Sequence, residues 1–388
     1  MSSVYENIKK ELFELHSLSE LSDDELYRLI NSIVIRHINE GEEIDRIAAA
    51  EKIFSSIRGL GVLDELLEDD NISEIMVNRY NQIFIDKRGN ISLSDVVFED
   101  EKSLYDTIQR IVGRSGKEVN ISSPIADTRL SGGERVNIVL PPVSIDGPII
   151  TIRRFPHKRI TMDDLVAYKT ITKEAAVFLE KLVVKKFNIL ISGGTSSGKT
   201  TFLNALSDYI PKNERIITIE DSAELQLSGI SNLIRLEARS SNTTGNGEIS
   251  IRELIRASLR MRPDRIIVGE VRGEEAIDML GAMNTGHDGS LSTGHANSSY
   301  DMIYRLETMV MQGNASFPVS AIREYIASSI DIIVHLRKNS DMERRVYEIS
   351  EVIGVENGEI ILNPIYKRKN GSLKATGNRI KNRKYTEG

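Results

Sequence analysis

A glycine-rich run in the middle of the chain limits the fold more than any other feature. The run is Gly-Gly-Thr-Ser-Ser-Gly-Lys-Thr over residues 193–200, and it matches the pattern G-x-x-x-x-G-K-S/T. An apolar stretch at 188–192 precedes it, and a stretch with helical spacing follows from about residue 200 to 209. A strand, a tight loop and a helix in this order predict an α/β fold with a mostly parallel sheet.

The same run is predicted to hold a phosphate group. Its glycines let the backbone turn tightly, so that successive amides point toward anionic oxygens, and the next helix start adds positive charge. Lys199 is expected to reach the β- and γ-phosphates of ATP, and the Thr200 hydroxyl to bind Mg²⁺. The predicted nucleotide-binding residues are Gly193, Gly194, Thr195, Ser196, Ser197, Gly198, Lys199, Thr200 and Thr201. The alternative is a strand-to-helix turn in which the Lys-Thr pair is coincidental.

Hydrolysis also requires a group that activates water, and one strand end supplies a candidate. The apolar stretch 265–270 ends in Glu270, with a glycine where this strand usually ends in a magnesium-binding aspartate. Glu270 is therefore predicted to act as the general base. The alternative is that it only caps the strand or pairs with Arg272.

A second acidic pair, Glu220 and Asp221, ends the strand predicted at 216–220. The carboxyl ends of parallel strands gather at one edge of a doubly wound sheet, where ligands bind. Two more carboxylates near a triphosphate are reasonable only with Mg²⁺ between them, so both are assigned to metal and water positioning. The sequence leaves open which of them lies nearer the metal.

A segment with two histidines among glycines, residues 286–297, follows the Glu270 strand. We interpret it as a sensing segment in which His295 bonds either a γ-phosphate or Glu270. The default role of a lone histidine is structural. Zinc binding is disfavoured because the chain has no cysteine.

Hydrophobic periodicity divides the 388 residues into five parts. Residues 1–58 have helical spacing, as at Ile8, Leu12 and Leu15, and Ser22 is predicted to begin a helix. Residues 59–156 predict an α+β domain, 157–172 a linker, 173–365 the α/β domain and 366–388 a basic tail. The predicted helix of the α+β domain covers 101–115. The predicted strands are 72–77, 82–86, 135–140, 149–154, 188–192, 216–220, 233–236, 265–270, 290–293, 331–336, 346–355 and 359–363.

Charge is distributed unevenly along the chain. The net charge is −7, but residues 366–388 carry eight Lys or Arg against one acid, or +7, so the remainder carries −14. An acidic body disfavours stable binding of nucleic acid. The tail is interpreted as a solvated, flexible end, with contact to an anionic membrane or partner as the alternative. No stretch reaches the ~20 apolar residues of a membrane helix, no secretory signal is expected at the start, and the missing cysteines fit a cytoplasmic location.

Arginines in the α+β domain form another candidate group, among them Arg129, Arg135, Arg153 and Arg154. Surface ion pairs are the default interpretation of each. Near a triphosphate, an arginine from another domain or subunit could neutralise transition-state charge. Arg153 and Arg154 are consecutive on a predicted strand and so face opposite ways, which allows at most one to face the nucleotide.

Several segments resemble the motifs of the secretion ATPases, the superfamily that drives type II and type IV secretion and type IV pili. Ile219–Leu225, Met261–Gly273 and Asn284–Ser298 resemble its Asp box, atypical Walker B strand and His box. Upstream, Ile72–Asn78, Arg135–Val143 and Thr151–Phe155 resemble the CpaF/TadA branch, which powers tight-adherence pili. The resemblance covers about residues 60–340. Other branches often carry a tetracysteine zinc module, which this chain cannot form.

The resemblance implies a cytoplasmic homohexamer at the inner membrane, whose protomer joins a PAS-like domain to a RecA-like ATPase domain. It implies that Glu270 is the catalytic glutamate and that Glu220 and His295 are box residues. It also implies that Arg135 and either Arg153 or Arg154 reach the phosphates. Residues 127–136 depart from the usual Asp-Gly turn, which leaves the arginine register open.

Three functions follow from these features. The first is an ATPase motor that powers pilus assembly or secretion through an inner-membrane platform protein, with membrane contact through partners or the tail. The second is a RecA-like nucleic-acid translocase, which the acidic body and the lack of an aromatic stacking stripe disfavour. The third is a nucleotide-gated scaffold without hydrolysis, which the intact Lys199 and Glu270 disfavour.

Overall fold

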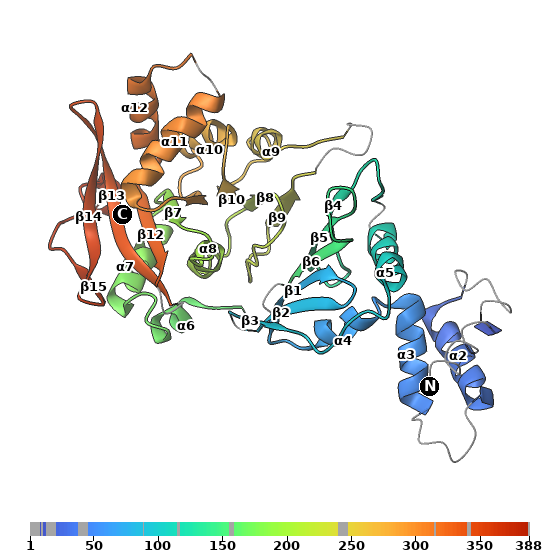
Figure 1. The fold of residues 1–388 in the computed structure, drawn as a ribbon. Coiled ribbons are helices and arrows are strands. Elements are labelled where there is room, and N and C mark those ends of the chain that lie inside the picture. Colours follow the sequence, from blue (N-terminus) through green and yellow to red (C-terminus); the bar gives the residue numbers. More distant parts are fainter. Residues whose placement is uncertain are drawn as a thin grey trace. The chain divides into compact units, whose positions relative to one another are not determined.

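The computed structural model describes residues 8, 11–12, 21–37, 46–87, 89–114, 117–154, 159–239, 247–313, 316–339 and 343–386. Leu15, Ser115 and Phe155, which the sequence placed in predicted elements or motifs, lie outside these ranges. The chain divides into two compact units, Met1–His157 and Lys158–Gly388, and each has its own core (Figure 1).

The first unit begins with helices α2 (Asp23–His37) and α3 (Arg46–Arg58). Leu26, Ile30 and Ile33 recur at helical spacing on α2 and are fully buried in a small core shared with α3. Ser22 and Glu25 form a reciprocal pair of hydrogen bonds at the start of α2, which satisfies backbone N–H groups as the sequence predicted.

A six-stranded antiparallel sheet with the order β3-β2-β1-β6-β5-β4 forms the rest of this unit. Helices α4 (Val62–Glu68) and α5 (Glu101–Arg114) contribute buried leucine and isoleucine side chains to the core on one face of it. The strands are β1 (Ile72–Arg79), β2 (Gln82–Lys87), β3 (Asn90–Leu93), β4 (Ile125–Arg129), β5 (Arg135–Val139) and β6 (Ile149–Arg153). The sequence did not predict β3 and β4, the two edge strands.

The second unit is built on a nine-stranded sheet with the order β15-β14-β13-β12-β7-β11-β10-β8-β9. Strands β7 to β12 run parallel, and β13 to β15 continue the sheet antiparallel. The bounds are β7 (Ile189–Gly193), β8 (Ile216–Glu220), β9 (Leu233–Glu237), β10 (Arg265–Val271), β11 (Leu291–His295), β12 (Ile332–Lys338), β13 (Arg344–Glu356), β14 (Glu359–Lys369) and β15 (Ser372–Ala375). The sequence did not predict β15.

Helices cover both faces of this sheet, which is why its central strands are apolar throughout. All five residues of β7 are buried, and so are all five of β8. Helices α6 (Met162–Ala167), α7 (Lys173–Val184) and α8 (Lys199–Ser207) pack on one face. Helices α9 (Ile251–Ser258), α10 (Glu275–Asn284), α11 (Ser299–Gly313) and α12 (Val319–Ser329) pack on the other, where Figure 1 shows α10 to α12 grouped together.

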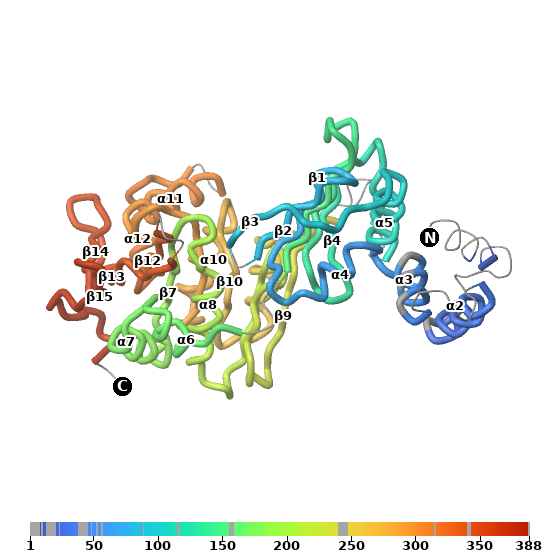
Figure 2. Tube along the Cα trace, turned by 60° about the horizontal axis from the view of Figure 1, so that its bottom comes forward, coloured from blue at the N-terminus to red at the C-terminus, as the bar shows by residue number. Residues whose placement is uncertain are grey.

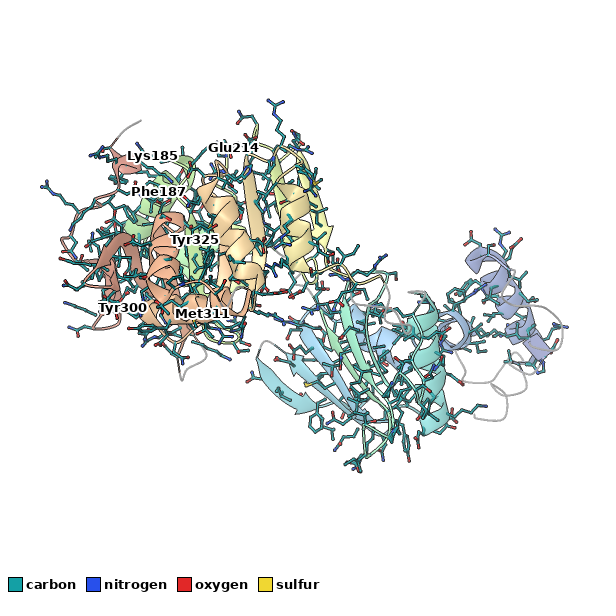
Figure 3. All side chains as sticks on the ribbon, turned by 90° about the horizontal axis from the view of Figure 1, so that it is seen from above. Lys185, Phe187, Glu214, Tyr300, Met311 and Tyr325 are labelled. Atoms are coloured by element: carbon teal, nitrogen blue, oxygen red, sulfur yellow. The ribbon has the colours of Figure 1, made fainter. Side chains whose placement is uncertain are left out.

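A buried ion pair fixes the amino-terminal edge of the parallel strands. The guanidinium of Arg265, at the start of β10, is fully buried and bonds both carboxylate oxygens of Glu214 (labelled in Figure 3) at 2.5 and 3.1 Å. It also donates to the carbonyls of Val183 and Gly289, which joins α7 to the loop before β11. A buried charge needs such complete pairing to offset its desolvation.

The basic C-terminal segment is folded onto the second unit, which differs from the flexible end expected from its composition. Its first residues continue β14 and form β15, and the chain then passes beside α7 (Figure 2). There the rings of Tyr385 and Phe178 lie 6.1 Å apart. The buried carboxylate of Glu351 accepts hydrogen bonds from the amides of Lys381 and Asn382 at 2.9 and 2.7 Å. These contacts explain the order of the segment. In the described part of the chain, no helix is both long and apolar enough to cross a membrane.

Candidate functional site

The glycine-rich loop 193–200 joins β7 to α8, as predicted. The structure explains why glycine stands at particular positions of this loop. Gly198 has a φ of +91°, a left-handed conformation that favours glycine. A side chain at Gly193 would lie only 2.7 Å from the carbonyl oxygen of Leu336 on β12. Gly194 has no atom within 4 Å of its ideal Cβ position, so that side of the loop is open. The loop is therefore tight against β12 and accessible at Gly194.

Lys199 begins α8 and turns its ammonium group back across the loop. Its side chain is largely buried (7% exposed), and Nζ lies 3.3 Å from the carbonyl oxygen of Gly194. The same Nζ lies 3.2 and 3.3 Å from the two ring nitrogens of His295. Burial lowers the pKa of Lys199, although the charge of Glu270 opposes this shift. An anion bound in the loop would stabilise the charged form of this desolvated lysine.

His295 connects Lys199 to Glu270. It ends β11, which lies between β7 and β10, so the topology brings the three side chains to one edge of the sheet. Its Nε2 is 2.7 Å from Oε1 of Glu270, whose other oxygen accepts from Arg272 at 2.7 Å. Burial and the charge of Lys199 lower the pKa of His295, while Glu270 opposes the shift. Glu270 thus makes both the predicted contact with His295 and the alternative contact with Arg272.

Glu220 ends β8 next to β10 and is almost fully buried (3% exposed). Its Oε1 accepts hydrogen bonds from the amides of Glu224 and Leu225 at 2.8 and 2.9 Å, whereas Oε2 is buried without a hydrogen-bond partner. Burial raises the pKa of Glu220 to about 7. A side chain at Gly269 would come within 2.9 Å of Glu220 Cγ, so the glycine before Glu270 makes room for this carboxyl group.

The donors at this edge fit a magnesium ion bound together with phosphate. Mg²⁺ usually takes one or two protein oxygens and completes its shell with phosphate and water. Thr200 is only partly buried, and the unsatisfied Oε2 of Glu220 is an available oxygen. Asp221 is exposed and lies 3.8 Å from Arg272. No group of three or more acidic or histidine side chains that could hold a metal by itself occurs among the described residues.

The arginines of the first unit separate into two environments. Arg129, Arg135 and Arg153 lie opposite one another on adjacent strands β4, β5 and β6, and Glu74 on β1 continues the row. They lie on the face that does not contribute to the core, because their strand neighbours point into it. Arg153 is exposed and lies 3.7 Å from Glu74.

Arg154 points the opposite way and is buried (7% exposed). Its guanidinium donates to the backbone carbonyls of Asp69 and Ile72 and lies 3.5 Å from the carboxylate of Asp70. The alternation expected for consecutive strand residues therefore holds, and it assigns the two arginines to different surroundings.

Three further cationic or histidine side chains near the loop were not identified from the sequence. The charge of Arg305 on α11 lowers the pKa of both Lys199 and His295. His335 on β12 contacts Ser192, and Arg344 on β13 contacts Ser196. His335 and Arg344 are 143 and 148 residues from their partners, and no local motif relates them.

Comparison with known proteins places these features in a family. A model described as type II/IV secretion system protein matches residues 57–377. The conjugal transfer protein TrbB of Rhizobium radiobacter is 33% identical over 295 residues, covering 75% of this chain and 87% of TrbB. The type IV secretion system protein PtlH of Bordetella pertussis is 33% identical over 318 residues, covering 75% and 93%.

A solved structure agrees at the level of the fold. The crystal structure of the pilus retraction motor PilT with bound ADP has a TM-score of 0.54 at 21% identity, covering 84% of this chain and 85% of PilT. The mixed α/β architecture with a large sheet core is therefore shared with PilT. The chain belongs to the type II/IV secretion system protein family.

Proposed function

We propose that this chain hydrolyses ATP, with Mg²⁺, at the loop 193–200. The observation that carries the proposal is the contact chain from Lys199 through His295 to Glu270, at the open edge of the parallel strands. One imidazole thus contacts both a phosphate-binding lysine and a carboxylate able to accept a proton from water. This arrangement serves γ-phosphate transfer to water.

Each residue then has a role. The backbone amides of residues 193–199 bind phosphate oxygens, Lys199 offsets their charge, and Thr200 with Glu220 or Asp221 would hold Mg²⁺, directly or through water. When bound, the metal neutralises charge on the phosphates. Glu270 accepts the proton of the attacking water. When nucleotide binds, His295 leaves Glu270 and contacts the γ-phosphate, and when nucleotide leaves, His295 returns to Glu270.

The arginine row of the first unit supplies additional positive charge to the nucleotide during turnover, from the same chain or a neighbouring copy. Arg135 and Arg153, joined by Arg129, are on the available face of the sheet and suit this role. Arg154 is bound to backbone carbonyls of its own unit, so we assign it a structural role.

At the level of the assembly, we propose a homohexameric motor of a secretion or pilus system, of the CpaF/TadA type, with a RecA-like second unit and a PAS-like sheet in the first. The names of TrbB and PtlH support a secretion partner, which we take to be a platform protein at the cytoplasmic face of the inner membrane. Exposed basic residues of the C-terminal segment would add attraction to anionic lipid; they are Lys367, Lys369, Lys374, Arg379, Lys381 and Arg383.

Phosphate release from Mg²⁺·ATP tests the proposal directly. The wild-type chain is expected to turn ATP over, and Lys199→Ala to lose at least ~10²-fold in rate. Lys212→Ala is the matched control, because Lys212 is an exposed lysine of the same unit that bonds the Ser228 carbonyl. Absence of turnover in the wild-type chain, or full activity in Lys199→Ala, would contradict the proposal. Strong stimulation by single-stranded DNA would instead favour a nucleic-acid translocase.

A further inference from the structure

His335 is a buried histidine on β12, beside the strand that leads into the loop. It is 2% exposed, and its Nδ1 lies 3.1 Å from Oγ of Ser192, directly opposite in the parallel pairing of β12 with β7. Its Nε2 accepts a hydrogen bond from Nε of Arg337 at 3.2 Å. Nε2 accepts this bond through its lone pair, while Nδ1 faces the hydroxyl of Ser192.

Arg337 extends this chain of hydrogen bonds to the segment that contains His295. Its Nη2 donates to the carbonyl oxygen of Asn297 at 3.2 Å, two residues beyond His295. The guanidinium also lies over the ring of Tyr347 on β13, 4.7 Å from the centroid. Arg337 is thus held in place from β13 while it bonds His335 and Asn297.

Together these contacts form a closed ring of hydrogen bonds that joins the ends of β7 and β11 next to the site. The amide of Ala296 donates to the carbonyl of Gly193 at 3.3 Å, so the ends of β7 and β11 are already joined. Ser192, His335, Arg337 and Asn297 form a second connection between the same two strand ends. His295, which contacts Lys199 and Glu270, immediately precedes the two residues, Ala296 and Asn297, at which these connections meet its segment.

The following strand contacts the loop itself. Nε of Arg344, the first residue of β13, donates to the carbonyl oxygen of Ser196 at 3.1 Å. Its Cδ lies 3.1 Å from the ideal Cβ position of Gly198, so its aliphatic part packs on the glycine that turns the loop. Ser196 has a φ of +56°, uncommon for a residue with a side chain, and Arg344 holds its carbonyl in that conformation.

We propose that strands β12 and β13 position the catalytic groups, with His335, Arg337 and Arg344 holding the phosphate loop and the His295 segment in register. The inference rests on the proposed ATPase function and extends it to residues outside every motif found in the sequence. None of the three side chains contacts Lys199 or Glu270, so they act by positioning. Through the same contacts, nucleotide binding at the loop also affects the antiparallel part of the sheet.

Separate measurements of ATP affinity and turnover test this role. Arg337→Ala is expected to lower kcat by ~10- to 100-fold, since a small misplacement of catalytic groups has effects of this size. The Kd for ATP should change by no more than about threefold, because the backbone cradle remains. Arg337→Lys should not restore kcat, because a lysine cannot form the planar, two-sided contact. Arg344→Gln, a surface change that leaves the core intact, is expected to act in the same direction.

Matched controls separate positioning from general stability. Lys212→Ala removes an exposed lysine that bonds the Ser228 carbonyl, and Arg345→Ala removes the neighbour of Arg344, which bonds the Tyr168 carbonyl. Both should keep kcat within about twofold of wild type. Wild-type kcat in Arg337→Ala and Arg344→Gln would overturn the inference but leave the ATPase function intact. An inactive wild-type chain would instead contradict the ATPase function.

Hydrogen exchange with Mg²⁺·ADP provides a readout that does not depend on hydrolysis. In the wild-type chain, ADP is expected to slow exchange in residues 192–199 and also in 335–339 and 344–347. In Arg337→Ala, protection should remain at the loop and disappear from the two strands. Protection confined to the loop in the wild-type chain would contradict the coupling.

Discussion

Nε2 of His295 lies 2.7 Å from Oε1 of Glu270, while Nζ of Lys199 lies 3.2 Å from Nδ1 of the same ring. The imidazole, whose Nε2 is also 3.3 Å from Nζ, therefore contacts both the lysine proposed to bind phosphate and the carboxylate proposed to activate water. Glu270 accepts a hydrogen bond from Arg272 on Oε2 and lies within ion-pair distance of His295 on Oε1, so its position is fixed from both sides. A γ-phosphate in the loop would compete for Lys199 and His295 and would release Glu270 toward water.

Substituting the carboxylate with its neutral isostere tests this arrangement. We expect Glu270→Gln to bind ATP with nearly unchanged affinity but to hydrolyse it at least ~10²-fold more slowly, because the amide cannot accept the proton. Binding is measured by equilibrium dialysis and turnover by phosphate release. Glu274→Gln is the control, since Glu274 is exposed and pairs with Arg252. Wild-type turnover in Glu270→Gln would reject the general-base role.

Part of the site could be predicted from the sequence because its residues follow apolar strands. The loop 193–200, Glu270, Glu220 and His295 each stand at the carboxyl end of such a strand, and parallel strands end at one edge. The contacts of His335 and Arg344 were not predictable, because they join positions 143 and 148 residues apart. Only the strand order, with β12 beside β7, brings them together.

The same reasoning explains which strands were identified. Strand β8 has the bounds predicted for it, 216–220, because all five residues are buried and apolar or strand-forming. Strands β3, β4 and β15 are edge strands of only four or five residues, which is too short for a hydrophobic pattern to identify them. The ordered C-terminal segment was missed because its buried acceptor, Glu351, is distant in sequence.

Loss of Arg153 should mainly affect ATP turnover, whereas loss of Arg154 should mainly affect stability. Arg153→Ala removes an exposed side chain with one weak ion pair, so stability should stay within about 0.5 kcal/mol while ATP turnover falls. Arg154→Ala leaves two backbone carbonyls without a buried donor and should destabilise the unit by ~2–4 kcal/mol. Thermal melting and phosphate release separate the two effects. A reversed pattern would show that Arg154 acts on the nucleotide.

Glu220 should give the protein a distinctive pH dependence. Burial raises its pKa to about 7 from 4.5. Between these values the folded chain keeps a proton that the unfolded chain releases, so stability is lost as pH rises from about 4.5 through about 7. The loss from this group is at most ~3 kcal/mol. The Glu220→Gln side chain cannot ionise. The melting temperature of this variant minus that of wild type should therefore increase as pH rises from 4.5 to 8.

Glu274→Gln is again the comparison for that measurement, because Glu274 is an exposed carboxylate of the same unit. Its difference from wild type should not grow with pH. A difference between wild type and Glu220→Gln that stays constant across the range would show that Glu220 is ionised in the folded chain at low pH. Adding Mg²⁺·ADP should reduce the difference at pH 7 if the nucleotide-bound metal stabilises the ionised carboxylate.

The C-terminal segment should detach when its buried acceptor is altered. Glu351 is 1% exposed and accepts hydrogen bonds from Lys381, Asn382 and the side chain of Asn363. Glu351→Gln replaces an acceptor oxygen by an amino group that faces these donors, and a loss of ~2–4 kcal/mol is expected. The segment contains several lysines and arginines, so limited trypsin digestion followed by mass measurement reports its release.

Two further variants serve as comparisons for the digestion of Glu351→Gln. Lys384→Met removes a half-exposed ion pair with Asp288 and Asp331 and should speed cleavage less than Glu351→Gln. Glu348→Gln changes a neighbouring carboxylate of β13 that pairs with Lys367 and should leave cleavage unchanged. Equal resistance of Glu351→Gln and wild type would mean that the segment is held by its apolar contacts, such as Tyr385 against Phe178, rather than by the buried carboxylate.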